Sequence, residues 1–258
     1  MKKTLTILLL AGLAYSVSIA QDDDTNEPAV TKHRASKIGG AGGFMPSWGL
    51  FKFTEVNNAL SQMGLPKFSD APMYMSGGIG YGYPMFIRNM RIGGFGSGGT
   101  VTQSFDKVNT TTNKKTRYDV EYGISYGGFL IDYVVPVAAR LDFSAGISFG
   151  GGTTHIKMTR DNGDLKSYDG LLQEFGRNDT TTGNYTRTLS GTFFTMVPNV
   201  NIEYALLPWF QLRIGVGYPI MTNPVWTMEN GDKVSNVPAG LKADGPVINA
   251  GIMFGYFN

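Results

Sequence analysis

The sequence predicts an all-β protein: a closed, antiparallel, up-and-down β-barrel of about eight strands, with one short amphipathic helix near the N-terminus. Two observations predict this fold. Apolar residues alternate with small or polar residues along several segments, which is the side-chain period of an extended strand. Short connections between these segments alternate with longer ones, as expected when antiparallel strands turn at opposite ends of a barrel.

The first 20 residues have the features of a secretory signal peptide. Lys2 and Lys3 give a positive start, Leu5 to Ala14 is apolar, and Ser18-Ile19-Ala20 is a small-x-small cleavage site. The apolar stretch is shorter than the about 20 residues that a membrane-spanning helix needs. We therefore expect an exported chain that crosses no membrane by helices.

Three parts follow the signal peptide. Residues 21–36 begin with an acidic run and have no apolar period, which predicts a periplasmic linker, and residues 37–258 are expected to form the barrel. Phe53 to Gly64 predicts the helix, with Thr54 as its cap and Gly64 as its stop. Its apolar face is expected to hold Val56, Leu60 and Met63.

Eight strands are expected. They lie near residues 37–48, 72–83, 90–105, 116–133, 140–156, 186–205, 209–221 and 246–257. The clearest alternation is that of Phe210 to Ile220, where every second residue is apolar. Between Arg117 and Leu130 the even positions are mostly apolar and the odd positions are charged or small, so we expect the even ones to face lipid. Pro198 lies on an apolar face and predicts a bulge or a break in the ladder.

Composition excludes several classes of function. The chain has 22 basic and 20 acidic residues, and the signal peptide holds two lysines and no acid, which leaves 20 of each. Nucleic-acid binding calls for clustered basic residues, so no nucleic acid is expected as a partner. The chain has no cysteine, which excludes disulfides and thiolate chemistry.

The composition of the polar faces distinguishes a soluble secreted barrel from a transmembrane barrel. A secreted soluble barrel also alternates, but its polar face meets water and is about a quarter to a third charged. Here the polar face is largely Gly, Ser and Asn with isolated charges, which suits a narrow lumen. We therefore expect a transmembrane barrel whose apolar face contacts lipid and whose edges must close. The soluble secreted protein is the alternative.

The end of the chain resembles the C-terminal strand by which bacterial outer-membrane barrels are recognised for assembly. The pattern is a polar residue, then Gly, then two aromatics, and it is matched by Asn249, Gly251, Phe254 and Tyr256. Phe257 and Asn258 depart from it, because the family usually ends on the aromatic. The resemblance is to the class, with small members of the OmpA/OmpX type, and it implies outer-membrane localisation, outer-membrane lipid contact and binding to the barrel-assembly machinery.

Isolated charges on the expected inner faces are candidates for a lumen charge network. They are Arg117, Asp119, Glu121, Arg140, Asp142, Glu203 and Arg213. Glu203 and Arg213 lie on adjacent strands joined by a tight turn, within pairing reach. Buried charges must be satisfied mutually or by water, so a polar plug is expected, and a selectivity lining for small solutes is the alternative.

No motif in the sequence predicts catalysis, a cofactor or a metal. Gly94 to Gly99 matches the GxGxxG pattern, but strand-like residues follow it where a dinucleotide site needs a helix. Asp161-Asn162-Gly163-Asp164 does not have the ligand order of an EF-hand. His155, near Asp161, Asp164, Ser167 and Asp169, is the remaining candidate for a general base; His33 lies in the linker.

The sequence therefore predicts a non-enzymatic outer-membrane barrel that anchors the envelope or displays surface loops. A passive channel for small solutes and an outer-membrane enzyme using His155 are the alternatives. The Asn- and Thr-rich stretches 107–116 and 161–184, with 223–244, are expected to lie outside the cell, where they would meet an external ligand that the sequence does not identify.

Overall fold

The computed structural model describes residues 39–84, 86–108, 110, 113–162, 167, 184–238 and 240–256. The predicted signal peptide, the predicted linker and His33 lie outside these residues. All statements below concern the described part of the chain.

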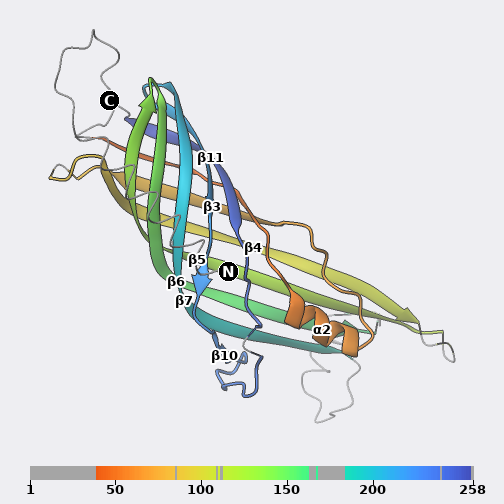
Figure 1. Cartoon of the computed structure of the whole chain (residues 1–258). Coiled ribbons are helices and arrows are strands. Elements are labelled where there is room, and N and C mark those ends of the chain that lie inside the picture. The colour runs from red at the N-terminus through yellow and green to blue at the C-terminus, as the bar shows by residue number, and fades with distance from the viewer. Residues whose placement is uncertain are drawn as a thin grey trace, which may run out of the picture. The chain divides into compact units, whose positions relative to one another are not determined.

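The strands form one antiparallel sheet that closes on itself (Figure 1). Its elements are β1 (Gly40–Phe44), β2 (Ser47–Gly49), α2 (Thr54–Gln62), β3 (Met73–Gly82), β4 (Met90–Val108), β5 (Lys115–Ala138), β6 (Leu141–Asp161), β7 (Tyr185–Leu207), β8 (Phe210–Gly217), β9 (Ile220–Met221), β10 (Val225–Thr227) and β11 (Val247–Tyr256). The ring closes because β1 and β2 each pair with both β3 and β11. The expected closed barrel of about eight strands with one short helix is confirmed.

The Gly-rich N-terminal segment occupies one position in the ring. It is broken into β1 and β2 at Met45 and Pro46, and both pieces keep the same two neighbours. Without this segment β3 and β11 would expose two unpaired edges. The least regular of the expected strands is therefore the one that closes the barrel.

The strands differ greatly in length. β5, β6 and β7 have 24, 21 and 23 residues, whereas β8 and β11 have 8 and 10. A membrane-spanning strand needs about 9–11 residues, so β5, β6 and β7 are each about twice as long as one membrane crossing requires. In Figure 1, α2 lies at the far end of these long strands.

The surface chemistry of β4, β5 and β6 changes at one cross-strand row, which is Gly96, Gly127 and Gly151. On one side of this row lies the part that we call the basal half. It comprises β1, β8, β11 and residues 78–82, 90–96, 127–138, 141–151 and 194–207. On the other side lies the distal half, which comprises α2, β10 and residues 97–108, 115–126, 152–161 and 185–193.

The core of the distal half is apolar. It lies on the inner face of the strands and includes Val120, Tyr122 and Ile156 together with Leu60 of α2. The ring of Phe53, just before α2, packs edge-on against Tyr122 with their centroids 5.1 Å apart. The helix therefore covers the inner face of the long strands, as in an ordinary water-soluble sheet.

The predicted face of β5 is wrong. Tyr122, Ile124, Tyr126 and Leu130, which we expected to face lipid, are buried on the inner face with Val120. Tyr118 shares their parity and lines a cavity beside α2. The odd positions face outward along the whole strand. Alternation gave the correct period but not which side was inside.

Two details of the helix also differ. Thr54 is the first helical residue rather than the cap, since Phe53 occupies the N-cap position without a side-chain hydrogen bond. Val56 and Leu60 are buried as expected, but Met63 follows the helix and is exposed. Gly64 has a φ of +67°, which favours glycine and ends the helix as expected. No helix in the described residues is long and apolar enough to span a membrane.

Pro198 breaks the ladder on one side. On the β6 side it stays in register opposite Ile147. On the other side β8 ends at Gly217 and β9 begins at Ile220, with Tyr218 donating its N–H to the Pro198 carbonyl at 3.1 Å. The expected irregularity is thus a break between β8 and β9, because proline has no N–H to donate.

Candidate functional site

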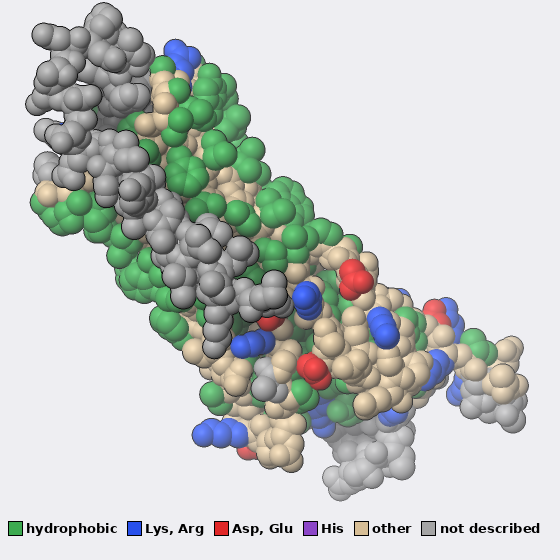
Figure 2. All heavy atoms as spheres, in the orientation of Figure 1, with side chains coloured by type: hydrophobic (Ala, Val, Ile, Leu, Met, Phe, Trp, Pro, Cys, Tyr) green, Lys and Arg blue, Asp and Glu red, His purple; other side chains and the backbone are tan. Residues whose placement is uncertain are grey.

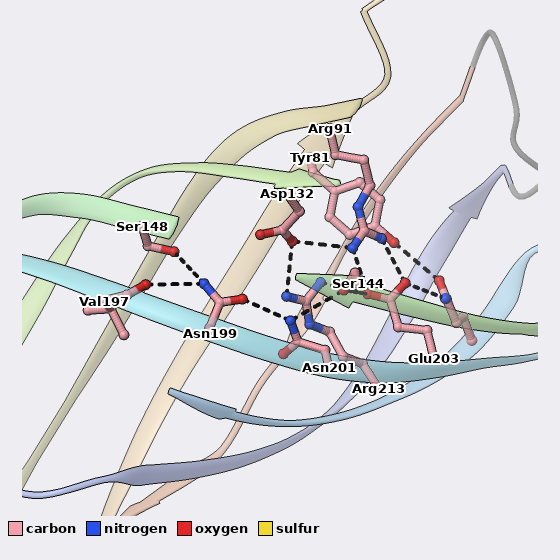
Figure 3. Close-up of polar contacts among 11 residues, drawn as sticks. Tyr81, Arg91, Asp132, Ser144, Ser148, Val197, Asn199, Asn201, Glu203 and Arg213 are labelled. Atoms are coloured by element: carbon pink, nitrogen blue, oxygen red, sulfur yellow. Dashed lines mark hydrogen bonds and ion pairs between the residues drawn. The ribbon is translucent and has the colours of Figure 1, made fainter. Parts of the chain in front are cut away.

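Four charged side chains meet in the lumen of the basal half (Figure 3). Arg91 contacts Glu203 through two hydrogen bonds, both of 2.7 Å, and lies 3.2 Å from Asp132. Arg213 lies 2.9 Å from Glu203 and 3.2 Å from Asp132. The four come from β4, β5, β7 and β8, so the contacts cross the interior of the barrel.

Neutral polar groups surround the charges (Figure 3). Gln211 and Ser144 both donate to the Glu203 carboxylate, at 2.7 and 3.1 Å. Tyr81 donates to Gln211 at 3.1 Å, and its ring centroid lies 4.2 Å from the Arg91 guanidinium. Asn201 continues the chain of hydrogen bonds to Ser144. Six strands from β3 to β8 thus contribute to one network, the lumen network.

The lumen network is electrically balanced and almost fully buried. It holds two guanidiniums and two carboxylates, whose side chains are exposed by 3% or less. Buried charges are tolerated when they are paired and hydrogen-bonded, and such a cluster is costly to break by removing one member. The arrangement cross-links the barrel wall and fills the lumen at this level, which is structural rather than catalytic chemistry.

The structure brings together only some of the predicted residues. Glu203 and Arg213 meet as described, and Asp142 lies on the inner face opposite Glu203 in register. Arg140 is instead in the turn between β5 and β6, with a φ of 71°. Its inward placement was therefore wrong.

The predicted inward placement of Arg117, Asp119 and Glu121 was also wrong. They occupy odd positions of β5 in the distal half and face outward, because the even positions there fill the apolar core. Arg117 contacts Asp119 at 3.0 Å on this outer face. Burial raises the pKa of Asp119, but hydrogen bonds from Ser104 and Arg117 outweigh it and hold that pKa below its usual value.

Two charged residues of the lumen network were not predicted, Arg91 and Asp132. Arg91 is an isolated charge near the start of β4, and no face was predicted for it. Asp132 carried the better signal. It shares the even parity of Tyr122 and Leu130, and a carboxylate on a lipid-facing position is strongly disfavoured. That single residue indicates that the even positions of β5 point inward.

His155 lies on the outer face of the distal half. Its Nε2 is 3.0 Å from Glu121 Oε1, and its ring covers Gly123 so closely that a side chain there would overlap it. Ser190 is its neighbour across the strands on β7, and the ring is turned away from it, toward β5. Glu121 thus engages the histidine, whereas the ring does not point toward the Ser190 hydroxyl.

The other motifs fall into ordinary structure. Gly94 to Gly99 lies within strand β4, as expected. In the described residues no group of His, Cys, Asp and Glu has the geometry to hold a metal ion. Asp161 is the last residue of β6 and Asn162 follows it, whereas Gly163, Asp164 and Asp169 lie outside the described residues.

The outer surface of the basal half is apolar (Figure 2). Its exposed side chains include Phe44, Ile92, Phe129, Val135, Ile202, Ile214, Val216, Ile248, Ile252 and Phe254. In Figure 2 the hydrophobic atoms cover one end of this view and the charged atoms gather toward the other. A contiguous apolar surface of this kind marks contact with a membrane or another protein.

The C-terminal strand β11 is part of this surface. Phe254 and Tyr256 point outward, and the Phe254 ring stacks on Trp209 with centroids 6.2 Å apart. Asn249 and Gly251 point inward. Phe257 and Asn258 lie outside the described residues.

No family model and no curated protein matched the sequence. Solved structures did. A major outer membrane protein of Thermus thermophilus matches 84% of this chain and 99% of its own, with 8% identity and a TM-score of 0.44. The outer membrane protein OprG of Pseudomonas aeruginosa matches 89% and 100%, with 13% identity and a TM-score of 0.40.

Ail, the attachment invasion locus protein of Yersinia pestis, was solved in complex with the heparin analogue sucrose octasulfate. It matches 85% of this chain and 96% of its own, with 12% identity and a TM-score of 0.31. These three are bacterial outer-membrane β-barrels. Their identities are too low to carry any residue's role over to this chain.

Proposed function

We propose that this protein is a non-enzymatic outer-membrane barrel whose basal half is a sealed anchor and whose distal half projects from the cell. The observation that carries the proposal is the reversal of polarity along the same strands. In the basal half the outside is apolar and the inside holds the lumen network. In the distal half the inside is an apolar core and the outside is polar.

The chain connections support this orientation. The turns at residues 139–140 and 208–209 lie at the basal end, whereas β4 ends and β5 begins at the distal end, as do the end of β6 and the start of β7. Outer-membrane barrels have short periplasmic turns and longer external loops. Basal turns in the periplasm and distal loops outside follow from this rule, and the C-terminal strand is then available to the assembly machinery as the sequence predicts.

The lumen network supports an anchor over a channel. Conduction requires a hydrated path, and here six strands contribute side chains to a buried, mutually paired cluster. We expect purified protein in planar lipid bilayers to give no stable conductance steps. Steps of nanosiemens size, kept at neutral pH, would contradict the sealed anchor and favour the channel for small solutes.

The enzyme hypothesis has less support. A serine hydrolase needs its histidine within hydrogen-bond reach of the nucleophile, and the His155 ring lies toward Glu121 instead of Ser190. We expect wild-type protein and a His155→Ala variant to be equally inactive toward phospholipid and peptide esters. Hydrolysis that disappears in the variant would overturn the non-enzymatic assignment.

The orientation is tested on intact cells. The chain has no cysteine, so one introduced cysteine is a unique label. A Lys157→Cys variant, on the outer face of the distal half, should react with a membrane-impermeant maleimide in whole cells. A cysteine in place of Arg140, in the basal turn, should react only after the envelope is opened. The reverse pattern would overturn the orientation.

A further inference from the structure

A cavity of about 290 Å³ lies in the distal half between the end of α2 and the inner faces of β4 to β7. This volume is near the lower end of the about 300–1,000 Å³ of small-molecule sites. The cavity is separated in position from the lumen network, since none of its lining residues belongs to that network. Neither the anchor nor the display of loops requires it.

The walls of the cavity are apolar and aromatic. Leu65 and Val120 belong to the buried distal core, and Met63 and Met158 line the same space. Tyr118 contributes a ring that is stacked on Phe105 with centroids 5.0 Å apart, which fixes its orientation. A flat or branched apolar group is the chemistry that such walls favour.

The charged groups of the cavity are mainly basic. Lys107 and Arg160 line it, Arg160 already has an interaction of its own, and the acid among the lining residues, Asp119, is paired with Arg117 at 3.0 Å. Lys107 is held in place: its Nζ donates to the Met63 carbonyl at 3.2 Å and lies 5.7 Å from the Tyr118 ring centroid. An ammonium has three donors, and a neutral carbonyl does not balance its charge.

We propose that this cavity binds a small amphipathic anion, with its apolar part against Leu65, Val120 and Met158 and its carboxylate or sulfonate at Lys107. Apolar walls alone would favour a neutral hydrocarbon, and basic groups alone would favour an inorganic anion. Their combination within one small cavity selects a molecule that carries both features. The site is independent of whether the basal lumen conducts.

The direct test is calorimetric titration of the mature protein in lipid nanodiscs, with empty nanodiscs as the blank. The probe is naphthalene-2-sulfonate. Two controls divide it into its parts: 2-naphthol has the rings without the charge at neutral pH, and methanesulfonate has the charge without the rings. We expect saturable binding of the probe at one site per chain and binding of each control weaker by about tenfold or more. 2-Naphthol loses a charge-assisted hydrogen bond, and methanesulfonate loses the burial of the apolar rings.

Variants locate the site. Lys107→Gln should weaken probe binding about tenfold, whereas Lys115→Gln, which removes an exposed lysine paired with Asp106 nearby, should leave it unchanged. Met63 is exposed at the cavity edge, so its replacement spares the core. Met63→Glu should weaken binding by adding a like charge, and Met63→Gln, of equal size, should not.

Each result of these experiments either supports or overturns the proposal. Saturable binding that follows this pattern supports the proposal. Binding of 2-naphthol equal to that of the sulfonate would replace the amphipathic anion by a neutral apolar ligand and overturn the proposal. No saturable binding, or binding that ignores both Lys107→Gln and Met63→Glu in variants that keep the native gel mobility, would overturn it as well.

Discussion

The basal and distal halves are built from the same strands but differ in chemistry on both faces. On β5 the even positions point inward along the whole strand; they are apolar in the distal half, as at Tyr122 and Ile124, and in the basal half they include the carboxylate of Asp132 between Leu130 and Val134. The odd positions point outward, from Glu121 in the distal half to Phe129 in the basal half. The backbone direction is constant, and the side chains change with the medium on each side.

The alternation of a single strand shows which side is inside only when the medium around that strand is known. A two-residue period gives two faces and does not say which is inside. In the proposed orientation water lies outside the distal half, which agrees with an apolar face that turns inward and is covered by α2. In the basal half the apolar face turns outward, and the polar face must satisfy its charges within the lumen. The two halves need different residues for stability.

The largest effect is expected from the same substitution made in each half. Glu203→Gln leaves Arg91 and Arg213 buried with one carboxylate between them, which should destabilise the barrel by about 3–5 kcal/mol. Glu121→Gln, in the partly exposed pair with His155, should cost about 0–1 kcal/mol. Denaturant titration followed by heat-modifiable gel migration measures both. Equal, small losses would show that the lumen network does not stabilise the fold.

The second prediction tests whether the distal half can lose stability without the basal half. Leu60 is 2% exposed in the distal core, and Leu60→Ala should cost about 2–5 kcal/mol through the cavity it leaves. We expect this loss to appear as faster amide exchange in α2 and the distal strands, while the basal strands keep their protection. Equal acceleration in both halves would mean that they unfold as one unit.

A lysine scan of the outer face compares the two surfaces. Ile214 is 62% exposed in the basal half, and Ile214→Lys should destabilise the barrel in lipid by about 2–4 kcal/mol, because a charge then faces hydrocarbon. Thr102→Lys, on the outer face of the distal half, should change stability by less than about 0.5 kcal/mol. Comparable effects at the two positions would contradict the lipid contact of the basal half.

The smallest effect is electrostatic. Hydrogen bonds from Ser104 and Arg117 outweigh burial and lower the pKa of Asp119, so the carboxylate is favoured in the folded state. A lowered folded pKa gives stability that is complete above the unfolded pKa and is lost as the pH falls through the folded pKa. Titration of the Asp119 carboxyl by NMR should give a midpoint that rises in Arg117→Gln. An unchanged midpoint would exclude the pairing.

Much of the fold was accessible from the sequence. The eight strand positions, the helix, its glycine stop and the break near Pro198 follow from local rules of period, capping and proline chemistry. The Gly-rich first strand was also expected, although its break at Pro46 was not. These features depend on residues close together in the chain.

The lumen network was harder to predict because it depends on residues far apart. Glu203 and Arg213 share a tight turn, so their meeting was foreseeable, but Arg91 is 112 residues from Glu203. Arg117 and Glu121 were assigned inward because one medium was assumed for the whole length of β5. The 24 residues of that strand, and the acid at Asp132, are the two features that argue for a strand passing through two media.

The central claim is the reversal at Gly127, and spin labels on β5 test it most directly. Single cysteines at positions 119, 121, 125, 129, 131, 133 and 135 would each carry a nitroxide in lipid nanodiscs. We expect a water-soluble nickel complex to relax the nitroxides at 119 to 125 and lipid-soluble oxygen to relax those at 129 to 135. The more effective reagent should therefore change near Gly127. Relaxation of the labels at 119 and 121 mainly by oxygen, or labels at 129 and 133 that oxygen does not relax, would contradict the account.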